Sequence, residues 1–278
     1  MREGPTGAVT VGAVTDVAGA ETVAELFGRV WAAEPGNLPV RRELVVAMAS
    51  SGAYVAVARQ GERVVGASLA WFGLEDDRPV LHSHMTAASP GEAGRGVGLA
   101  LKRHQRSWCL ERGVEEIRWT FDPLVRRNAW FNLTKLGAAV TGYAVDFYGA
   151  LPDGINAGDE SDRVLVRWDL AGPAAVAAAA GDVAAPDAEG LLAAGALVVL
   201  GLGPDGEPVP GDAPVPGEPV LCATPPDIET DRRERPGHAR DWRQALRSAL
   251  GGALDRGWRA TGISRSGWYV LESPEART

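Results

Sequence analysis

The chain is poor in lysine and contains no long apolar run. Lys102 and Lys135 are its two lysines, so arginine supplies nearly all of the positive charge, and the formal net charge over 278 residues is −8. This acidic balance disfavours a nucleic-acid-binding surface, which normally carries clustered positive charge. No segment approaches the ~20 uninterrupted apolar residues of a membrane span, and no basic region followed by an apolar run opens the chain. We therefore expect a cytoplasmic protein without a nucleic-acid or membrane partner.

Cysteine is scarce as well. Cys109 and Cys222 lie far apart without metal-ligand spacing, so we expect two reduced, uninvolved thiols and no metal site. The hydrophobic content of 45% is enough for one large core or two smaller ones.

Strand and helix patterns alternate from residue 9 to residue 169 and predict an α/β chain built around one mixed sheet. The predicted strands cover residues 9–14, 54–59, 64–71, 80–88, 116–121, 138–147 and 163–169, and the predicted helices cover 21–31, 40–49, 97 to about 113, and 125–136. We take residues 1–170 as the first domain.

Residues 171–278 differ in composition and are expected to form a smaller α/β extension packed on the first domain. An alanine-rich segment (174–196) precedes a loop crowded with glycine and proline (201–219). A strand (220–223), a helix (239–256) and a closing strand pair (258–263 and 268–271) follow.

The most informative stretch is LHSHMTAASPGEAGRGVG, from Leu81 to Gly98. It predicts a strand, a glycine-rich turn and a helix whose first amides are available to an anion. An ordinary tight turn is the alternative. The spacing predicts a buried helical stripe and a solvated face. The stripe comprises Val97, Ala100, Leu101, His104 and Trp108, and the solvated face comprises Lys102, Arg103, Gln105 and Arg106.

This order of elements, with the Gly94 to Gly98 turn after the central strand, resembles the GNAT superfamily of acyl-CoA-dependent acyltransferases over roughly residues 9–169. Two strings, WTFDPLVRRNAWFNLTKLGA (119–138) and FYGALPDGINAGDESDRVLVRW (147–168), are similar to an uncharacterised-type GNAT subfamily with a C-terminal extension. The resemblance implies a mixed, mostly antiparallel central sheet flanked by helices. It also implies acyl transfer from acetyl-CoA or succinyl-CoA to a small amine, such as an amino acid.

The resemblance further implies where acyl-CoA binds. In the superfamily, the turn amides hold the diphosphate, and the strand before the turn splays from its neighbour and pairs with the pantetheine arm. The usual arginine or glutamine of the turn is Ala93 here, and Arg95 is expected to supply its charge. Asn128 and Asn132 share a helix face and are candidates for the pantetheine amides, although Asn128 could instead cap a turn. The candidate acyl-CoA-binding residues are Thr86, Ala87, Ala88, Gly94, Arg95, Gly96, Val97, Gly98, Asn128 and Asn132.

Amide formation needs a neutral amine, so a group must accept a proton, and histidine suits that task near neutral pH. His82 and His84 are two apart on a strand and should face the same side of the sheet. Arylalkylamine N-acetyltransferases, a GNAT branch, carry a similar His-x-His on this strand. We expect His84 to be the main base, assisted by His82; the alternative is a pair of histidines with no catalytic role, in the core or at the sheet surface.

The superfamily's usual acid for the CoA thiolate, a tyrosine, corresponds to Leu133 here. Tyr143, Tyr148 and Asn132 are candidate replacements, and Tyr143 is our first choice. For the two tyrosines, packing on a strand is the alternative. Several arginines could bind a substrate carboxylate, but each is as readily explained as a surface charge. These arginines are Arg118, Arg126, Arg127, Arg243 and Arg247.

We expect direct transfer in a ternary complex, with the C-terminal extension shaping the acceptor site. Two alternatives stay open: a GNAT fold used for acyl-CoA hydrolysis or decarboxylation, and a CoA-binding sensor module without turnover. The sequence leaves a homodimer open.

Overall fold

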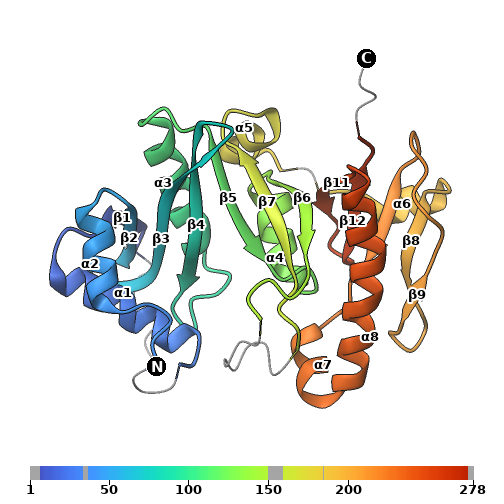
Figure 1. Cartoon of the computed structure of the whole chain (residues 1–278), viewed down its shortest axis with the longest axis horizontal. Coiled ribbons are helices and arrows are strands. Elements are labelled where there is room, and N and C mark those ends of the chain that lie inside the picture. Colours follow the sequence, from blue (N-terminus) through green and yellow to red (C-terminus); the bar gives the residue numbers. More distant parts are fainter. Residues whose placement is uncertain (1–6, 34–36, 150–158, 184, 275–278) are drawn as a thin grey trace. The chain divides into compact units, whose positions relative to one another are not determined.

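The computed structural model describes residues 7–33, 37–149, 159–183 and 185–274 (Figure 1). Residues 150–158, within the second string that resembles the GNAT subfamily, and residue 184, within the alanine-rich segment, lie outside the described residues. The chain divides into two compact units, one extending to Arg118 and one beginning at Trp119. The boundary expected from composition lies at residue 170. The division observed falls inside a strand.

The first unit is a mixed sheet in the order β1-β2-β3-β4-β5 with helices packed on it. Neighbouring strands are antiparallel except β4 and β5, which are parallel. The predicted mostly antiparallel sheet flanked by helices is therefore confirmed. Its elements are β1 (Val9–Ala13), α1 (Val17–Val30), α2 (Arg42–Ser50), β2 (Tyr54–Gln60), β3 (Arg63–Glu75), β4 (Arg78–Ala88), α3 (Val97–Leu110) and the first half of β5 (Glu116–Phe121).

Two apolar clusters cover the sheet of the first unit. In the larger one, Val23, Leu26 and Phe27 of α1 pack with Leu69 of β3 and Met85 of β4. The spacing of these α1 residues places them on one helical stripe, and burying that stripe stabilises the helix more than its intrinsic propensity does. The smaller cluster joins α3 to β2 and β3.

Helix α3 lies close to the backbone of β3 because Gly66 has no side chain. A Cβ at Gly66 would come within 2.5 Å of a Val97 methyl group and 2.9 Å of the Ala87 carbonyl oxygen. The glycine therefore sets how near the start of α3 approaches the end of β4.

The burial of α3 differs from the predicted stripe. Lys102 and Gln105 were expected on the solvated face, but they are 4% and 0% exposed. Lys102 Nζ donates to the Ser83 hydroxyl at 2.8 Å and to the Gln105 amide oxygen at 3.1 Å. The prediction was wrong because Ser83 and Ser68 of the sheet accept hydrogen bonds from Lys102 and Gln105 inside the core.

Lys102 should make the stability of the first unit depend on pH. Burial lowers its pKa to about 7, so between pH 7 and pH 10 the unfolded chain binds a proton that the folded chain does not. Folding stability should therefore rise over this range by about 1 kcal/mol per pH unit. Lys102→Met removes that slope and should stabilise the protein at pH 7 by about 1–3 kcal/mol, after the lost hydrogen bonds are counted. Urea unfolding of both proteins at pH 7 and pH 9.5 measures this; equal slopes would contradict a neutral buried lysine.

The second unit has the strand order β5-β7-β6-β11-β12-β10-β8-β9, beginning with the Trp119–Phe121 part of β5. Its further elements are α4 (Arg126–Ala129), the π-helical segment η1 (Trp130–Lys135), β6 (Ala139–Ala144), β7 (Arg163–Asp169), α5 (Pro173–Ala180), α6 (Ala188–Ala193), β8 (Leu197–Leu202), β9 (Pro208–Pro210), β10 (Val220–Ala223), α7 (Ile228–Glu234), α8 (Pro236–Leu246), the π-helical segment η2 (Arg247–Gly251), α9 (Gly252–Asp255), β11 (Arg259–Ile263) and β12 (Trp268–Glu272).

The second unit contains an internal repeat. The order β5-β7-β6-β11-β12-β10 reads the same from both ends when β5 is matched with β10, β6 with β11 and β7 with β12. In both halves a helix with a π-helical segment follows the first strand, and a glycine with positive φ precedes the second strand. These glycines are Gly137 and Gly257, with φ of +70° and +87°.

The register of the strands supports the same repeat. Val140 of β6 pairs with Ala260 of β11, antiparallel, at the centre of the palindrome. The next residue in each strand, Thr141 or Thr261, is the extra residue of a β-bulge against the partner strand. The two halves thus meet about a pseudo-twofold axis, and β11 of the same chain covers the edge of β6. A homodimer would have to use another edge or face.

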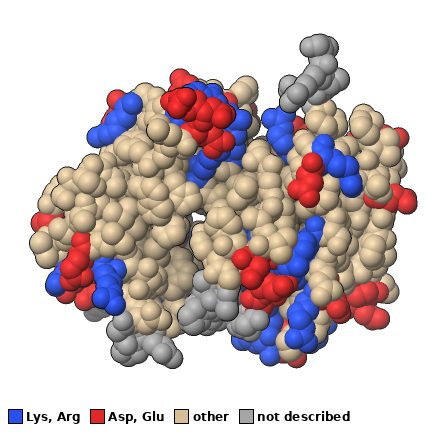
Figure 2. Space-filling model, in the orientation of Figure 1, with Lys and Arg blue, Asp and Glu red and all other residues tan. Residues whose placement is uncertain are grey.

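Charges of both signs are interspersed on the face of the molecule drawn in Figure 2, where Asp and Glu side chains lie beside Lys and Arg. Among the described residues, no helix is both long and apolar enough to cross a membrane.

Candidate functional site

The glycine turn joins β4 to α3 in the first unit, as predicted. Gly91, Gly94 and Gly96 have φ of +83°, +77° and +84°, a left-handed conformation that favours glycine. A Cβ at any of them would meet no atom within 4 Å, so the turn surface is open. Helix α3 begins at Val97, and no side chain caps it. Its first amides therefore point their hydrogens outward without an intrahelical partner, as an anion site requires. Gly98 lies inside the first turn of α3.

Arg63, Arg95 and Glu92 at the turn together carry one net positive charge. Glu92, at the centre of the turn, is 5% exposed and accepts a hydrogen bond from Arg63 at 2.6 Å. Its other oxygen lies 3.8 Å from an Arg95 guanidinium nitrogen. Arg95, expected to supply the missing charge of the turn, is thus partly compensated by Glu92, and Arg63 restores the positive balance.

The strand before the turn pairs with β3 along one edge. Thr86, Ala87 and Ala88 lie opposite Ser68, Ala67 and Gly66. On its other edge, β4 pairs with β5 at Leu81 and His82. Within the described residues of the first unit, this second edge has no strand partner from residue 83 onward. Its backbone groups there could pair with an extended ligand.

A β-bulge at His84 orients the side chains of β4. Leu69 of β3 lies opposite Met85 and Ala70 lies opposite Ser83, which leaves His84 as the extra residue. As a result, Ser83 points toward α3 and accepts a hydrogen bond from Lys102. Met85 points to the other face of the sheet, where it packs in the larger apolar cluster with α1. His82 and His84 lie on the same face as Met85.

His82 and His84 lie together, as predicted, and Trp71 of β3 lies beside both. The ring centroids of His82 and His84 are 5.8 Å apart, and the Trp71 centroid is 4.9 Å from the first and 4.8 Å from the second. Partial desolvation lowers the pKa of both histidines, and the proximity of His84 and of Lys102 lowers that of His82 further. Both rings are therefore neutral at pH 7 and able to accept a proton. Trp71 is not among the residues predicted for the site, although strand pairing in a β3–β4 hairpin places it opposite His82.

The remaining candidates lie in the second unit. The amide oxygen of Asn132 accepts a hydrogen bond from the Trp119 indole at 3.2 Å, and the side chain is buried. Asn128 lies within α4, which begins without a side-chain cap. The Tyr143 hydroxyl donates to Asp162 at 2.7 Å. Burial raises the pKa of Tyr143, and the contact with Asp162 raises it further, so this tyrosine holds its proton tightly.

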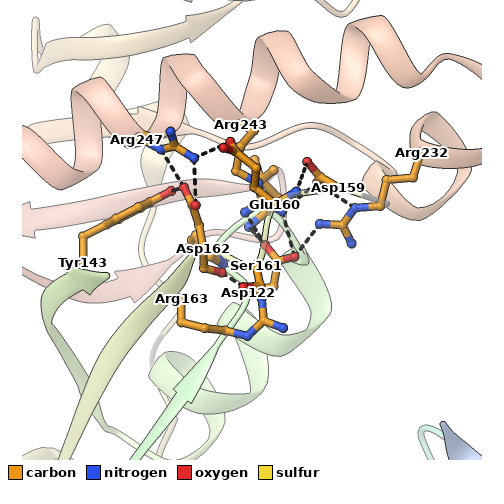
Figure 3. Close-up of polar contacts among 12 residues, drawn as sticks. Asp122, Tyr143, Asp159, Glu160, Ser161, Asp162, Arg163, Arg232, Arg243 and Arg247 are labelled. Carbon is orange, nitrogen blue, oxygen red and sulfur yellow. Dashed lines mark hydrogen bonds and ion pairs between the residues drawn. The ribbon is translucent and has the colours of Figure 1, made fainter. Parts of the chain in front are cut away.

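An arginine–carboxylate network in the second unit joins the segment before β7 to α7 and α8 (Figure 3). Arg243, expected to be a surface charge, is 1% exposed and binds Asp122 through two bonds of 3.0 Å, and Asp159 at 2.7 Å. Arg232 also binds Asp122 and Asp159. The surface interpretation of Arg243 was therefore wrong.

The network continues toward Tyr143. Arg247 binds Asp162 at 2.8 and 2.9 Å and Glu160 at 2.6 Å, and Asp162 accepts the Tyr143 hydroxyl. The three arginines and four carboxylates nearly balance, so we interpret the network as a structural clamp rather than a site for a substrate carboxylate. Among the described residues no group of three or more His, Cys, Asp or Glu side chains is arranged to hold a metal ion.

No family model matches the chain, and the comparison with curated proteins finds no relative. Solved structures do match. An aminoglycoside acetyltransferase from an uncultured soil metagenomic sample, in complex with sisomicin, is 18% identical with a TM-score of 0.38, over 41% of this chain and 78% of that one. Arabidopsis thaliana Naa50, in complex with the bisubstrate analogue CoA-Ac-MVNAL, is 16% identical with a TM-score of 0.45, over 57% and 97%.

An acetyltransferase of the GNAT family from Streptococcus pneumoniae is 12% identical with a TM-score of 0.46, over 58% of this chain and 98% of that one. The solved structures that match the chain include acetyltransferases of the GNAT superfamily.

Proposed function

We propose that this protein is an acyl-CoA-dependent N-acyltransferase that acylates a small amine. The observation that carries the proposal is the junction of β4 with α3. An open, uncapped helix start lies at the end of a strand that has an unpaired edge and carries two neutral histidines, one of them at a β-bulge. The first feature suits a diphosphate, the second an extended pantetheine arm, and the third an amine that must lose a proton.

The acyl-CoA would lie along β4. The diphosphate would accept hydrogen bonds from the amides of Gly94 to Gly98, and Arg95 and Arg63 would favour its negative charge. Backbone groups of Thr86 to Ala88 would pair with the pantetheine amides. Asn128 and Asn132 are kept as further candidates for these amides, with the Asn132 amide nitrogen as donor because its oxygen is engaged by Trp119.

The reaction would proceed without a covalent enzyme intermediate. An ammonium ion bound near His84 gives one proton to the neutral imidazole and becomes an amine. The amine nitrogen attacks the thioester carbonyl carbon, a C–N bond forms, and the C–S bond breaks. The second proton leaves the nitrogen and reaches the CoA thiolate, so the products are an amide and free CoA. His84 then returns its proton to water, and His82 assists by accepting or relaying it.

Tyr143 is a weak candidate for protonating the thiolate. Its proton is already shared with Asp162, and its raised pKa makes it a poor acid. We therefore assign the second proton to the thiolate directly or through water. An acetyl or succinyl group as the acyl chain rests on the sequence resemblance.

A pair of variants at Gly96 tests the turn. Asp and Asn have nearly the same shape and both tolerate the left-handed conformation of this residue, but Asp adds a negative charge at the helix start. Gly96→Asp should weaken CoA binding at least about tenfold more than Gly96→Asn, since a helix N-terminus and a phosphate interact mainly by charge. Isothermal titration calorimetry with CoA at low salt measures both affinities. Equal affinities of the two variants, or no CoA binding by the wild-type protein, would contradict the proposal.

A further inference from the structure

Trp71, His82 and His84 form a three-ring cluster on one face of the β3–β4 hairpin. We propose that this cluster binds the acceptor as an ammonium ion, and that the acceptor is therefore a cationic amine without a carboxylate beside its nitrogen. The proposal rests on the proposed function for the fate of the bound amine, but the binding site itself can be tested without any acyl transfer.

The geometry provides a surface for a cation. Trp71 is 36% exposed, and its ring is tilted by 41° and 46° against the rings of His82 and His84. A tryptophan face attracts ammonium ions more strongly than the other aromatic side chains do. Because both histidines are neutral at pH 7, they do not repel the cation, and their ring nitrogens can accept its hydrogens.

An arginine bound to two carboxylates lies beside the cluster. His82 pairs with Arg118 of β5, and the Arg118 guanidinium binds Glu75 and Glu116. Lys102 lies across β4, bound to Ser83 toward α3. A substrate carboxylate at the cluster would meet two carboxylates and an arginine that already binds both of them.

Binding and deprotonation are thereby joined in one place. The ammonium is held over Trp71 within reach of His84, and once it has given up its proton the cation–π attraction is lost. The neutral amine is then free to move toward the acyl carbon. Trp71 is a specificity-determining residue in this account, because it acts on the ground-state ammonium and not on the thioester.

Tetramethylammonium is a suitable probe, since it is a cation that cannot be acylated. The chain has four histidines, so NMR of protein labelled at histidine reports the cluster separately from His104 and His238. Tetramethylammonium chloride should shift the His82 and His84 signals in a saturable way and leave His104 unchanged. Sodium chloride at equal ionic strength, and tert-butanol as an uncharged molecule of similar size, should not reproduce the shift.

Two variants separate a binding role from a structural one. Trp71→Leu should weaken tetramethylammonium binding at least about fivefold, and Trp71→Phe should lie between it and the wild type. Phe72→Leu is the matched control, because Phe72 stacks on Trp108 on the other side of the sheet; it should bind the probe like the wild type. In turnover, Trp71→Leu should raise KM for the amine and change kcat little.

CoA affinity distinguishes the two proposals. Trp71→Leu should bind CoA like the wild type, which also verifies that the first unit is folded. No saturable shift in the wild type, or undiminished probe binding by Trp71→Leu, would overturn the ammonium site while leaving the acyltransferase proposal in place. If the wild type binds the probe but no CoA, the acyltransferase proposal fails and the ammonium site stands.

Discussion

Replacing His84 with alanine is expected to lower kcat by about 10²–10⁴-fold, because a positioned general base contributes about that much to proton transfer. The affinity for CoA should stay within about twofold, since the proposed diphosphate contacts lie at the helix start and not at the bulge. His82→Ala should reduce kcat less, since in the proposed mechanism His82 only assists His84. Steady-state kinetics with acetyl-CoA and a good amine, together with CoA calorimetry, measure both effects.

His104→Ala is the matched control. His104 lies on α3 with its Nδ1 2.9 Å from the Tyr54 hydroxyl, so its loss should affect stability and not turnover. If His84→Ala retains wild-type kcat, or if His104→Ala loses as much, the base is not His84.

The pH dependence of kcat/KM is a second test of His84 as the general base. The pKa of His84 is lowered by burial, so the imidazole stays neutral to a lower pH than free histidine does. Activity should fall on the acid side with a midpoint below 6.5, and the His84→Ala variant should lack this acid limb. An acid midpoint above 6.5 would contradict a desolvated, neutral base.

Breaking the buried ion pair of the second unit is expected to have the largest effect on stability. Arg243→Ala removes both hydrogen bonds to Asp122 and the bond to Asp159. A buried carboxylate that loses its partner typically costs 3–5 kcal/mol, so a destabilisation of about 3 kcal/mol or more is expected. Arg240→Ala, on the exposed side of the same helix, should change stability by less than about 0.5 kcal/mol. Thermal and urea unfolding of the two variants measure the difference.

The stability that the ion pair of Asp122 with Arg243 contributes should decrease at low pH. Burial alone would raise the pKa of Asp122, but the charges of Arg243 and Arg232 outweigh burial and hold its pKa well below the usual range. A carboxyl whose pKa is lower in the folded state contributes stability that is present above about pH 4 and is lost as the pH falls further. The Arg243→Ala variant should therefore lose less stability on acidification than the wild type. An Arg243→Ala protein as stable as Arg240→Ala would show that the clamp contributes nothing.

Periodicity sufficed for most elements of the fold. Strands β5, β7 and β10 have the bounds predicted from the sequence, because short runs of branched and aromatic residues between turn signals leave few alternatives. The glycine turn and the shared face of His82 and His84 also follow from local pattern. In each case, the chemistry of a few neighbouring residues determines the structure.

Other features depend on partners distant in sequence. The burial of Lys102 depends on Ser83, and the burial of Arg243 depends on Asp122, 121 residues earlier in the chain. No periodic pattern marks a charged side chain as buried when its partner comes from another element. Helix α7 was missed because its sequence, IETDRRE, is almost entirely polar. The repeat in the second unit became visible only from the strand order and the two threonine bulges.

The central claim is that an amine, and not water, receives the acyl group. The direct test follows the release of CoA thiol from acetyl-CoA with and without a panel of cationic amines, and identifies the products by mass spectrometry. We expect thiol release that requires an amine and matches the acylated amine mole for mole. Release at the same rate without amine, or no release with any acyl-CoA and amine despite tight CoA binding, would contradict the account.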